Sequence, residues 1–163
     1  MSDDDLDQAL ALQSRITAFV RAFGLHQPDR TPCGAPVPAS EAHAVGELDR
    51  DGPLTQSALG ERLRLEKSTV SRLVSQLTSR GWVQRADRGG DGRLVWLELT
   101  PDGRRAAGEL AVARATRFAE LLRSIPADQR PSVIAALTTL VDAAGGQPAA
   151  EVSGAAPGRA GPR

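Results

Sequence analysis

The sequence is poor in several residue types, and each shortage narrows what the chain can be. It has one cysteine and no tyrosine among 163 residues. A single cysteine cannot close a disulfide within one chain, so we expect a reducing compartment, the cytoplasm. No apolar run approaches the roughly 18 residues that span a bilayer. The acidic start, residues 1–5 (MSDDD), does not resemble a secretory signal. These absences favour a soluble cytoplasmic protein with no membrane partner.

The charged residues are balanced in number but unevenly placed. Hydrophobic residues make up 40% of the chain and charged residues 25%, which is enough for a globular core. Residues 55–105 carry 10 Lys and Arg against 6 Asp and Glu, a net charge of +4. Residues 1–54 carry 4 against 9, a net charge of −5. A basic middle segment is compatible with binding a polyanion, and also with an ordinary solvated face.

Apolar residues at helical spacing predict a long helix near the beginning of the chain. Residues 6–23 carry one broad apolar face, and Gly24 is placed to end the helix. The next stretch, residues 25–39, contains four prolines, which predict a turn-rich connector instead of a helix. Ser40 is then expected to cap a short helix that ends near Leu48.

The middle of the chain predicts two short helices joined by a tight turn. Thr55 is expected to cap the first, which runs from Gln56 to about Leu63. The second covers residues 66–79 and ends at Gly81. Its apolar residues recur at helical spacing and predict a buried face, whereas its other faces are polar. The buried face comprises Val70, Leu73, Val74 and Leu77, and the polar faces carry Ser68, Thr69, Ser71, Arg72, Ser75 and Gln76.

The segment after these helices predicts a β-hairpin. Residues 82–85 and 94–99 have the composition of two strands, and the glycine-rich stretch between them suits an exposed loop. Two helices followed by a hairpin with an arginine-bearing tip describe a winged helix-turn-helix. In such proteins the second helix enters the major groove of DNA, while Arg88 and Arg93 would reach the adjacent minor groove.

Helices are also predicted at the end of the chain. Thr100 and Pro101 begin a helix that runs to about Ser124. Pro126 breaks it, and a last helix continues to residue 144. The remaining residues are rich in glycine, alanine and proline and are expected to be disordered.

Several motifs resemble the MarR family of bacterial transcriptional regulators. They are residues 54–63 (LTQSALGERL), 67–74 (KSTVSRLV), 80–83 (RGWV), 91–93 (DGR) and 99–103 (LTPDG). The resemblance is specific over about residues 54–105. It implies a homodimer whose terminal helices interlock, with each winged domain binding half of a palindromic operator. It also implies that Asp91 braces the wing and that Arg93 contacts DNA.

The resulting fold class is mainly α with a small β-hairpin wing, a winged helix-turn-helix flanked by N- and C-terminal dimerisation helices. The apolar stripes of the terminal helices are too long for a small winged domain to cover, which independently favours a dimer. The expected divisions are an N-terminal dimerisation helix (1–24), a Pro-rich connector (25–39), the DNA-binding domain (40–100), C-terminal dimerisation helices (101–144) and a disordered tail (145–163).

The residues expected to contact DNA lie on the second helix, at its approach and on the wing. They are Thr55, Lys67, Ser68, Thr69, Ser71, Arg72, Gln76, Arg88, Asp91 and Arg93. These residues predict a cytoplasmic DNA-binding regulator, a repressor that an unidentified small-molecule, metal or redox effector releases from its operator.

The only cysteine and both histidines lie within eighteen residues, as His26, Cys33 and His43. No cofactor is required, but thiolate and imidazole together suit Zn²⁺, with Cys33 and His43 as the first candidate ligands and His26 as a weaker one. Alternatively, Cys33 is a redox group, or all three side chains are inert. Zinc-responsive members of the resembled family carry further histidines on the long helix after the wing, and this chain has none there.

Two other function classes compete with DNA binding. A winged-helix module that binds only protein would not need Lys67, Arg72 and the wing arginines on one side. An enzyme would need a recognisable site, and the sequence shows no phosphate-binding glycine loop, catalytic carboxylate pair or nucleophile constellation. We therefore expect a protein that is not an enzyme.

Overall fold

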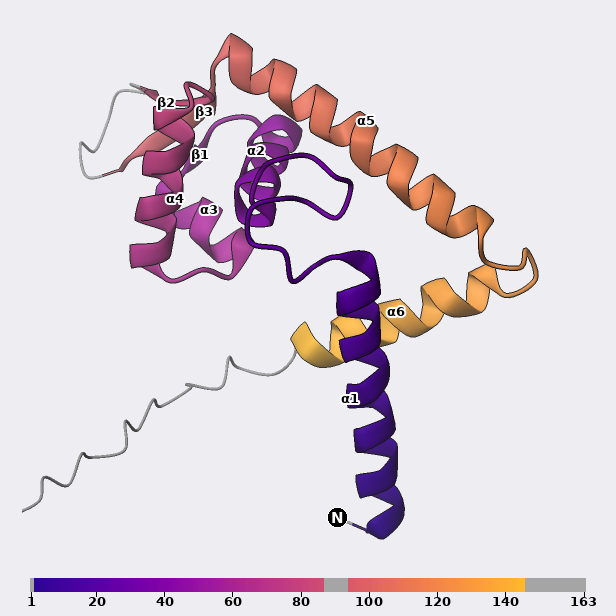
Figure 1. Ribbon diagram of the computed structural model, residues 1–163. Helices are drawn as coiled ribbons and strands as arrows, with labels where there is room; N and C mark the ends of the chain where they lie inside the picture. Colours follow the sequence, from indigo (N-terminus) through magenta and orange to yellow (C-terminus); the bar gives the residue numbers. More distant parts are fainter. Residues whose placement is uncertain (1, 87–93, 146–163) are drawn as a thin grey trace, which may run out of the picture. The chain divides into compact units, whose positions relative to one another are not determined.

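The chain divides into two units, Met1–Glu120 and Leu121–Arg163. The computed structural model describes residues 2–86 and 94–145. The first unit contains a small antiparallel sheet with helices packed around it, and the second contains the last helix, α6, Arg130–Gly145 (Figure 1). No helix in the described ranges has both the length and the apolar character needed to cross a membrane.

The first helix, α1, spans Asp3–Phe23, with Asp3, Asp4 and Asp5 in its first turn. Ser2 caps it, because its hydroxyl accepts a hydrogen bond from the Asp5 N–H at 3.2 Å while the Asp5 carboxylate accepts one from the Ser2 N–H at 2.9 Å. The pKa of Asp5 is lowered first by the hydrogen bond that its carboxylate accepts from the Ser2 backbone N–H, and then by the Ser2 side chain. The helix ends at Gly24 in the left-handed conformation, as predicted.

The connector is folded on itself, and it leads into α2, Ala39–Asp51. Thr31 makes a tight turn, since its N–H donates to the Ala35 carbonyl at 2.9 Å and its hydroxyl accepts from the Ala35 N–H at 3.1 Å. The predicted cap at Ser40 is wrong. Pro38 occupies the capping position without a side-chain bond, because its fixed φ of −52° already leads the chain into the helix.

The predicted helix-turn-helix is present as α3, Gln56–Leu63, and α4, Lys67–Ser79. Thr55 caps α3 as expected, its hydroxyl accepting from the Ala58 N–H at 3.1 Å. The α4 residues predicted to be buried are buried, and they join one core with α2, α3 and the sheet. Withdrawing each such aliphatic side chain from water contributes about 1.5–3 kcal/mol. The four residues are Val70, Leu73, Val74 and Leu77.

The sheet has three strands, so the prediction of a two-stranded hairpin is incomplete. The strands are β1, Leu54–Thr55, β2, Val83–Ala86, and β3, Trp96–Leu99, in the order β1-β3-β2. The strand β1 pairs with β3 through Leu54 opposite Leu97. The observed β2 starts one residue later than predicted and β3 starts two residues later.

The long helix α5, Pro101–Arg123, begins in direct contact with the turn between α4 and β2. The Thr100 hydroxyl accepts from the Gly103 N–H at 3.0 Å, which confirms the predicted cap, and donates to the Gly81 carbonyl at 2.6 Å. A β-carbon on Gly103 would overlap the carbonyl oxygen of Trp82. The first turn of α5 therefore lies directly against Gly81 and Trp82, the residues that connect α4 to β2.

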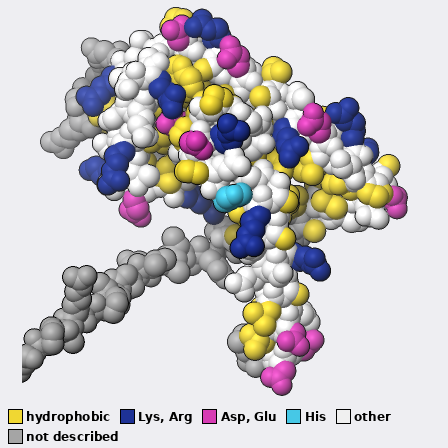
Figure 2. Space-filling view, viewed as in Figure 1, with side chains coloured by type: hydrophobic (Ala, Val, Ile, Leu, Met, Phe, Trp, Pro, Cys, Tyr) yellow, Lys and Arg dark blue, Asp and Glu magenta, His cyan; other side chains and the backbone are white. Residues whose placement is uncertain are grey.

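Apolar side chains remain uncovered along the helices outside the winged domain. In the first unit they follow α1, whose acidic residues gather at its beginning (Figure 2). The second unit has such a face on α6, of which no residue is buried. The exposed apolar side chains include Leu6, Leu10, Leu12, Ile16 and Phe19 on α1, Val112, Phe118 and Leu122 on α5, and Ile134, Leu137 and Val141 on α6.

Candidate nucleic-acid interface

The turn between α3 and α4 is held by the backbone. Arg64 is the only residue other than glycine with positive φ in the described part of the chain, at φ 53° and ψ 45°. Its N–H donates to the Glu61 carbonyl at 3.2 Å, and the Leu65 N–H donates to the Gly60 carbonyl at 3.0 Å. This paired arrangement ends α3 and starts α4 three residues later.

The outward face of α4 is polar and exposed, as the sequence predicts. The hydroxyl of Ser75 donates back to the Ser71 carbonyl at 3.0 Å, so it is already engaged within the helix. The remaining polar side chains make no hydrogen bond or ion pair with any described residue. A row of unpartnered donors and acceptors on one helix suits the edges of bases in a major groove. These residues are Lys67, Ser68, Thr69, Ser71, Arg72 and Gln76.

Thr55 has a different environment from the residues of α4. It is half-buried at the start of α3, and its hydroxyl oxygen is engaged in capping that helix. Three other predicted contacts, Arg88, Asp91 and Arg93, lie outside the described residues. The strands that lead to them are well defined, with Ala86 opposite Trp96 at the end of the ladder.

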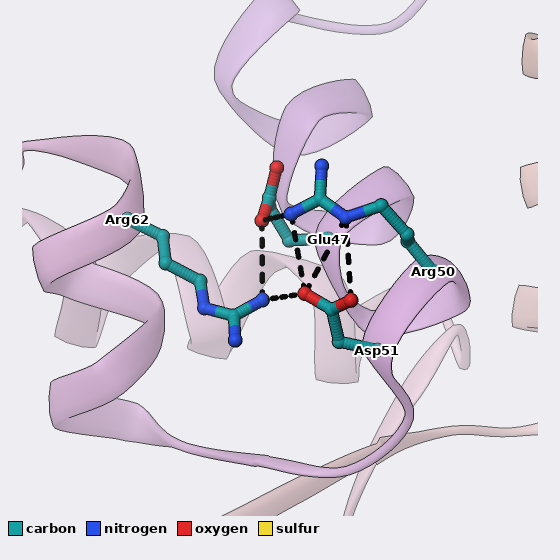
Figure 3. Close-up of polar contacts among 4 residues, drawn as sticks. All are labelled: Glu47, Arg50, Asp51 and Arg62. Carbon is teal, nitrogen blue, oxygen red and sulfur yellow. Dashed lines mark hydrogen bonds and ion pairs between the residues drawn. The ribbon is translucent and has the colours of Figure 1, made fainter.

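Three further arginines belong to α3, to the turn after it and to β2, and sequence reasoning missed them as candidate contacts. Arg64 at the turn and Arg85 on β2 are exposed, with no described partner for either side chain. Arg62 is instead tied to α2, through Glu47 at 3.4 Å and through a closer ion pair with Asp51 (Figure 3). The net charge of the middle segment was the signal for such residues, but it does not distinguish paired from free arginines.

The ion pairs in Figure 3 also fix α2 against α3. Arg50 of α2 contacts Glu47 and lies 3.1 Å from Asp51, so each of these two α2 carboxylates pairs with Arg50 of the same helix and with Arg62 of α3. All four side chains are partly exposed, so each pair contributes little by itself. Together they hold the helix-turn-helix against α2, and Figure 2 shows Lys and Arg side chains outward over α3 and α4.

The predicted sensor residues are only partly brought together. Cys33 and His43 both line an apolar pocket, and the Cys33 sulfur lies 2.9 Å from the Thr31 hydroxyl. His26 does not line it. Within residues 2–86 and 94–145, no three His, Cys, Asp or Glu side chains gather where they would hold a metal ion. Two donors alone do not complete the four-ligand shell of zinc, so the described residues do not fit a closed site.

The pocket itself lies between the connector, α2 and α5, and has a volume of about 110 Å³. Phe23 and Phe118 meet there with ring centroids 5.4 Å apart. The guanidinium of Arg117 lies 5.5 Å from the Phe23 ring centroid, and its Nε is buried without a hydrogen-bond partner in the described structure. A second, more polar pocket of about 240 Å³ adjoins it and shares Ala42, His43, Leu110 and Arg114.

The helix-turn-helix, the three-stranded wing and the exposed polar face of α4 define a winged helix-turn-helix protein of the DNA-binding class. Comparison with known proteins agrees with this class. The model of the MarR family matches residues 35–94. Over this stretch the chain is similar to the MarR family of DNA-binding transcriptional regulators. This is a family of regulators and not of enzymes, as expected from the sequence.

Individual relatives extend the similarity over most of the chain. An HTH-type transcriptional regulator of Mycobacterium leprae is 26% identical over 130 residues, 80% of this chain and 87% of that protein. One from Mycobacterium tuberculosis is 28% identical over 125 residues, 77% of this chain and 87% of that protein.

Solved structures share the same fold. PcaV of Streptomyces coelicolor, in complex with its natural ligand, is 26% identical, with a TM-score of 0.58 over 84% of this chain and 91% of that one. The MepR protein of S. aureus, solved as a DNA complex, is 18% identical. Its TM-score is 0.59, and the match covers 88% of this chain and 99% of that one. The second likeness concerns the fold alone.

Proposed function

We propose that this protein is a cytoplasmic, homodimeric repressor that binds a palindromic operator and is released by a small anionic aromatic effector. The observation that carries the proposal is the exposed face of α4, which presents six polar side chains without described partners. Desolvating such side chains is favourable only against a polar partner, and the edges of DNA bases supply complementary donors and acceptors.

The local charge supports DNA as that partner. Lys67 and Arg72 on α4, Arg64 at the turn and Arg85 on β2 are exposed cations of the winged domain without a described carboxylate partner. Cations placed in this way neutralise phosphates and release counterions. MepR, which shares the fold, was solved as a DNA complex, and MarR of E. coli was solved with operator DNA.

The uncovered apolar faces support a dimer. Leu10 of α1 is 54% exposed and Ile134 of α6 is 58% exposed. Apolar faces of this length are stable in water when a second copy covers them, and a two-fold dimer places two recognition helices on the two halves of a palindrome.

The pocket between α2 and α5 supports an effector with one aromatic ring and an acidic group. Its volume of about 110 Å³ is close to that of cavities that hold one benzene ring. The guanidinium of Arg117 lies over the Phe23 ring; its Nη1 is 3.7 Å from Glu120, whereas its buried Nε is a donor without a hydrogen-bond partner among the described residues. PcaV, which is similar over most of its length, was solved with a natural ligand.

Selection of genomic fragments by the purified full chain tests DNA binding. We expect enrichment of fragments that share one palindrome, which a gel shift then confirms with a scrambled duplex as control. If no fragment is enriched, or if the scrambled duplex binds equally well, DNA binding by sequence is excluded. A winged-helix module that binds protein is then the better assignment.

Benzoate is a suitable probe of the pocket because it carries one ring and one carboxylate. We expect it to bind the wild type and to weaken operator binding. The Arg117→Gln variant should lose most of that binding, whereas Arg105→Gln should not, since Arg105 lies exposed at the start of α5 and pairs with Asp102. Equal benzoate affinity in both variants would remove Arg117 from the site.

A further inference from the structure

Glu41 of α2 is the only charged side chain that is buried within the described ranges, with 2% of its surface exposed. Its Oε2 atom lies 2.5 Å from the Nε of Arg80, an ion pair that does not have the geometry of a hydrogen bond. A carboxylate withdrawn from water is costly unless a cation compensates it. Arg80 supplies that compensation, so the position of Arg80 is tied to the position of Glu41.

Arg80 directly follows α4, the helix proposed to enter the major groove of DNA. It occupies the position after Ser79, the last residue of α4, and its N–H donates to the Gln76 carbonyl at 3.0 Å. Its guanidinium also lies 5.4 Å from the centre of the Trp82 ring. A buried carboxylate and an aromatic ring therefore hold the same side chain, and through it the last turn of α4 is held to α2.

This contact restrains the part of the molecule where small movements matter most. The side chains of Thr69, Arg72 and Gln76 must meet base edges at hydrogen-bond distances, so a slight rotation of α4 misplaces all of them. The buried face of α4 consists of aliphatic side chains, whose hydrophobic attraction is not directional. The ion pair of Glu41 and Arg80 restrains one specific point, at the end of the helix.

We propose that Glu41 and Arg80 are positioning residues for operator recognition, and that their ion pair sets the orientation of α4 without contacting a base. This inference rests on the proposed DNA-binding function. It assigns specificity to a buried residue of α2 that lies outside the face presented to DNA.

A double-mutant cycle on the full chain tests the proposal with the variants Glu41→Gln, Arg80→Gln and both together. Each single change should lower the ratio of operator affinity to scrambled-duplex affinity about tenfold, as the loss of one base contact does. The double variant should lose no more than either single one, and the salt dependence should stay at the wild-type slope. Arg105→Gln is the matched control, since it removes an arginine from an exposed ion pair on α5, and its ratio should not change.

Three outcomes would overturn the proposal. The first is an affinity loss for Arg80→Gln that is equal on both duplexes and accompanied by a shallower salt slope, which would make Arg80 a phosphate contact. The second is additivity of the two single changes. The third is an unchanged ratio in Glu41→Gln. If Glu41→Gln does not fold, Arg80→Gln and Arg80→Lys are compared instead. Arg80→Gln removes the cation beside Glu41 and should lower the ratio, whereas Arg80→Lys keeps a cation there and should retain most of the ratio. Equal ratios in these two variants would overturn the proposal.

Hydrogen exchange separates this inference from the proposed function. If the wild type shows no preference for any operator, DNA recognition fails, but the ion pair is still tested by the amides of Gly81 and Trp82, which close the end of α4. These amides should exchange faster in Glu41→Gln, while those of α3 keep their wild-type rates. If Gly81 and Trp82 exchange at their wild-type rates in Glu41→Gln, the pair does not hold α4.

Discussion

Gly60 of α3 faces Val70 of α4 so closely that a β-carbon on Gly60 would lie 2.9 Å from the Val70 Cγ2 atom. The two helices of the DNA-binding motif meet at this point, and Val70 is a buried, β-branched residue with little freedom to rotate. The crossing of α3 and α4 therefore depends on the absence of a side chain at one position.

Replacing Gly60 by alanine should destabilise the fold by about 1–3 kcal/mol, because the new methyl group overpacks the contact with Val70. Urea unfolding followed by circular dichroism measures the change. Gly108→Ala is the control, since Gly108 is an exposed residue of α5 with no atom within 4 Å of the added carbon. That variant should gain about 0.5–1 kcal/mol from helix propensity. Equal effects of both substitutions would contradict the packing argument.

Arg64→Gly should change stability and DNA binding in opposite directions. The left-handed backbone at position 64 is strained for arginine but not for glycine, so the variant should be about 1 kcal/mol more stable. Loss of one phosphate contact should lower affinity for all duplexes and reduce the salt slope by about 1 per subunit. Arg64→Asn should lose the same binding with a smaller gain in stability. A wild-type salt slope in either variant would show that Arg64 does not contact DNA.

Thr69→Ala and Arg72→Ala should relax sequence preference as well as lower affinity. Both residues lie on the exposed face of α4, where a good base contact contributes about 1–3 kcal/mol of discrimination. Gel shifts on the operator and a scrambled duplex measure the ratio. Ser75→Ala is the control on the same helix, because its hydroxyl is already bonded to the Ser71 carbonyl. Wild-type ratios in Thr69→Ala and Arg72→Ala would mean that α4 is not the reader.

Deleting residues 1–24 should abolish specific binding although it removes no residue of the α4 face. The proposed dimer loses the apolar face of α1, and the two half-sites are then no longer bound together. Light scattering and gel shifts measure the two losses. A milder pair of variants is Ile16→Asp, on the apolar side of α1, and Ala18→Asp, on the opposite side. Only Ile16→Asp should weaken the dimer. If the variant that lacks residues 1–24 is still dimeric and still binds the operator, α1 is not a dimerisation helix.

Zinc should bind weakly, and it should not change the affinity of the protein for its operator. Cys33 and His43 share one pocket, but no third described ligand joins them, so water would have to complete the shell. Calorimetry should therefore show no affinity tighter than micromolar. A tighter site that Cys33→Ala and His43→Ala each abolish would restore the metal-sensor hypothesis, which so far stays a prediction.

Local signals were sufficient to predict most of the DNA-binding region. The spacing of Val70, Leu73, Val74 and Leu77 predicted which side of α4 is buried, because a helix in water buries its apolar stripe. Thr55, Thr100 and Gly81 were predicted as helix ends because capping depends on nearby residues alone. The exposed face of α4 followed directly from the buried one.

Features that depend on distant residues were missed. The strand β1 has two residues, and only its pairing with Leu97 and Trp96, some forty positions away, makes it a strand. The buried ion pair of Glu41 and Arg80 joins residues equally far apart, and nothing local marks Glu41 as buried. The Ser40 cap failed for a local reason, since Pro38 began the helix earlier.

The contact of Gly103 with the Trp82 carbonyl has a consequence for the length of DNA that the protein reads. It fixes the direction in which α5 leaves the winged domain, because no β-carbon at position 103 separates the two segments. In the proposed dimer, α5 connects the winged domain to the two-fold axis. The direction of α5 therefore sets the distance between the two copies of α4. That distance must match one turn of the duplex, roughly 34 Å. A single absent methyl group thus helps determine how many base pairs separate the halves of the operator.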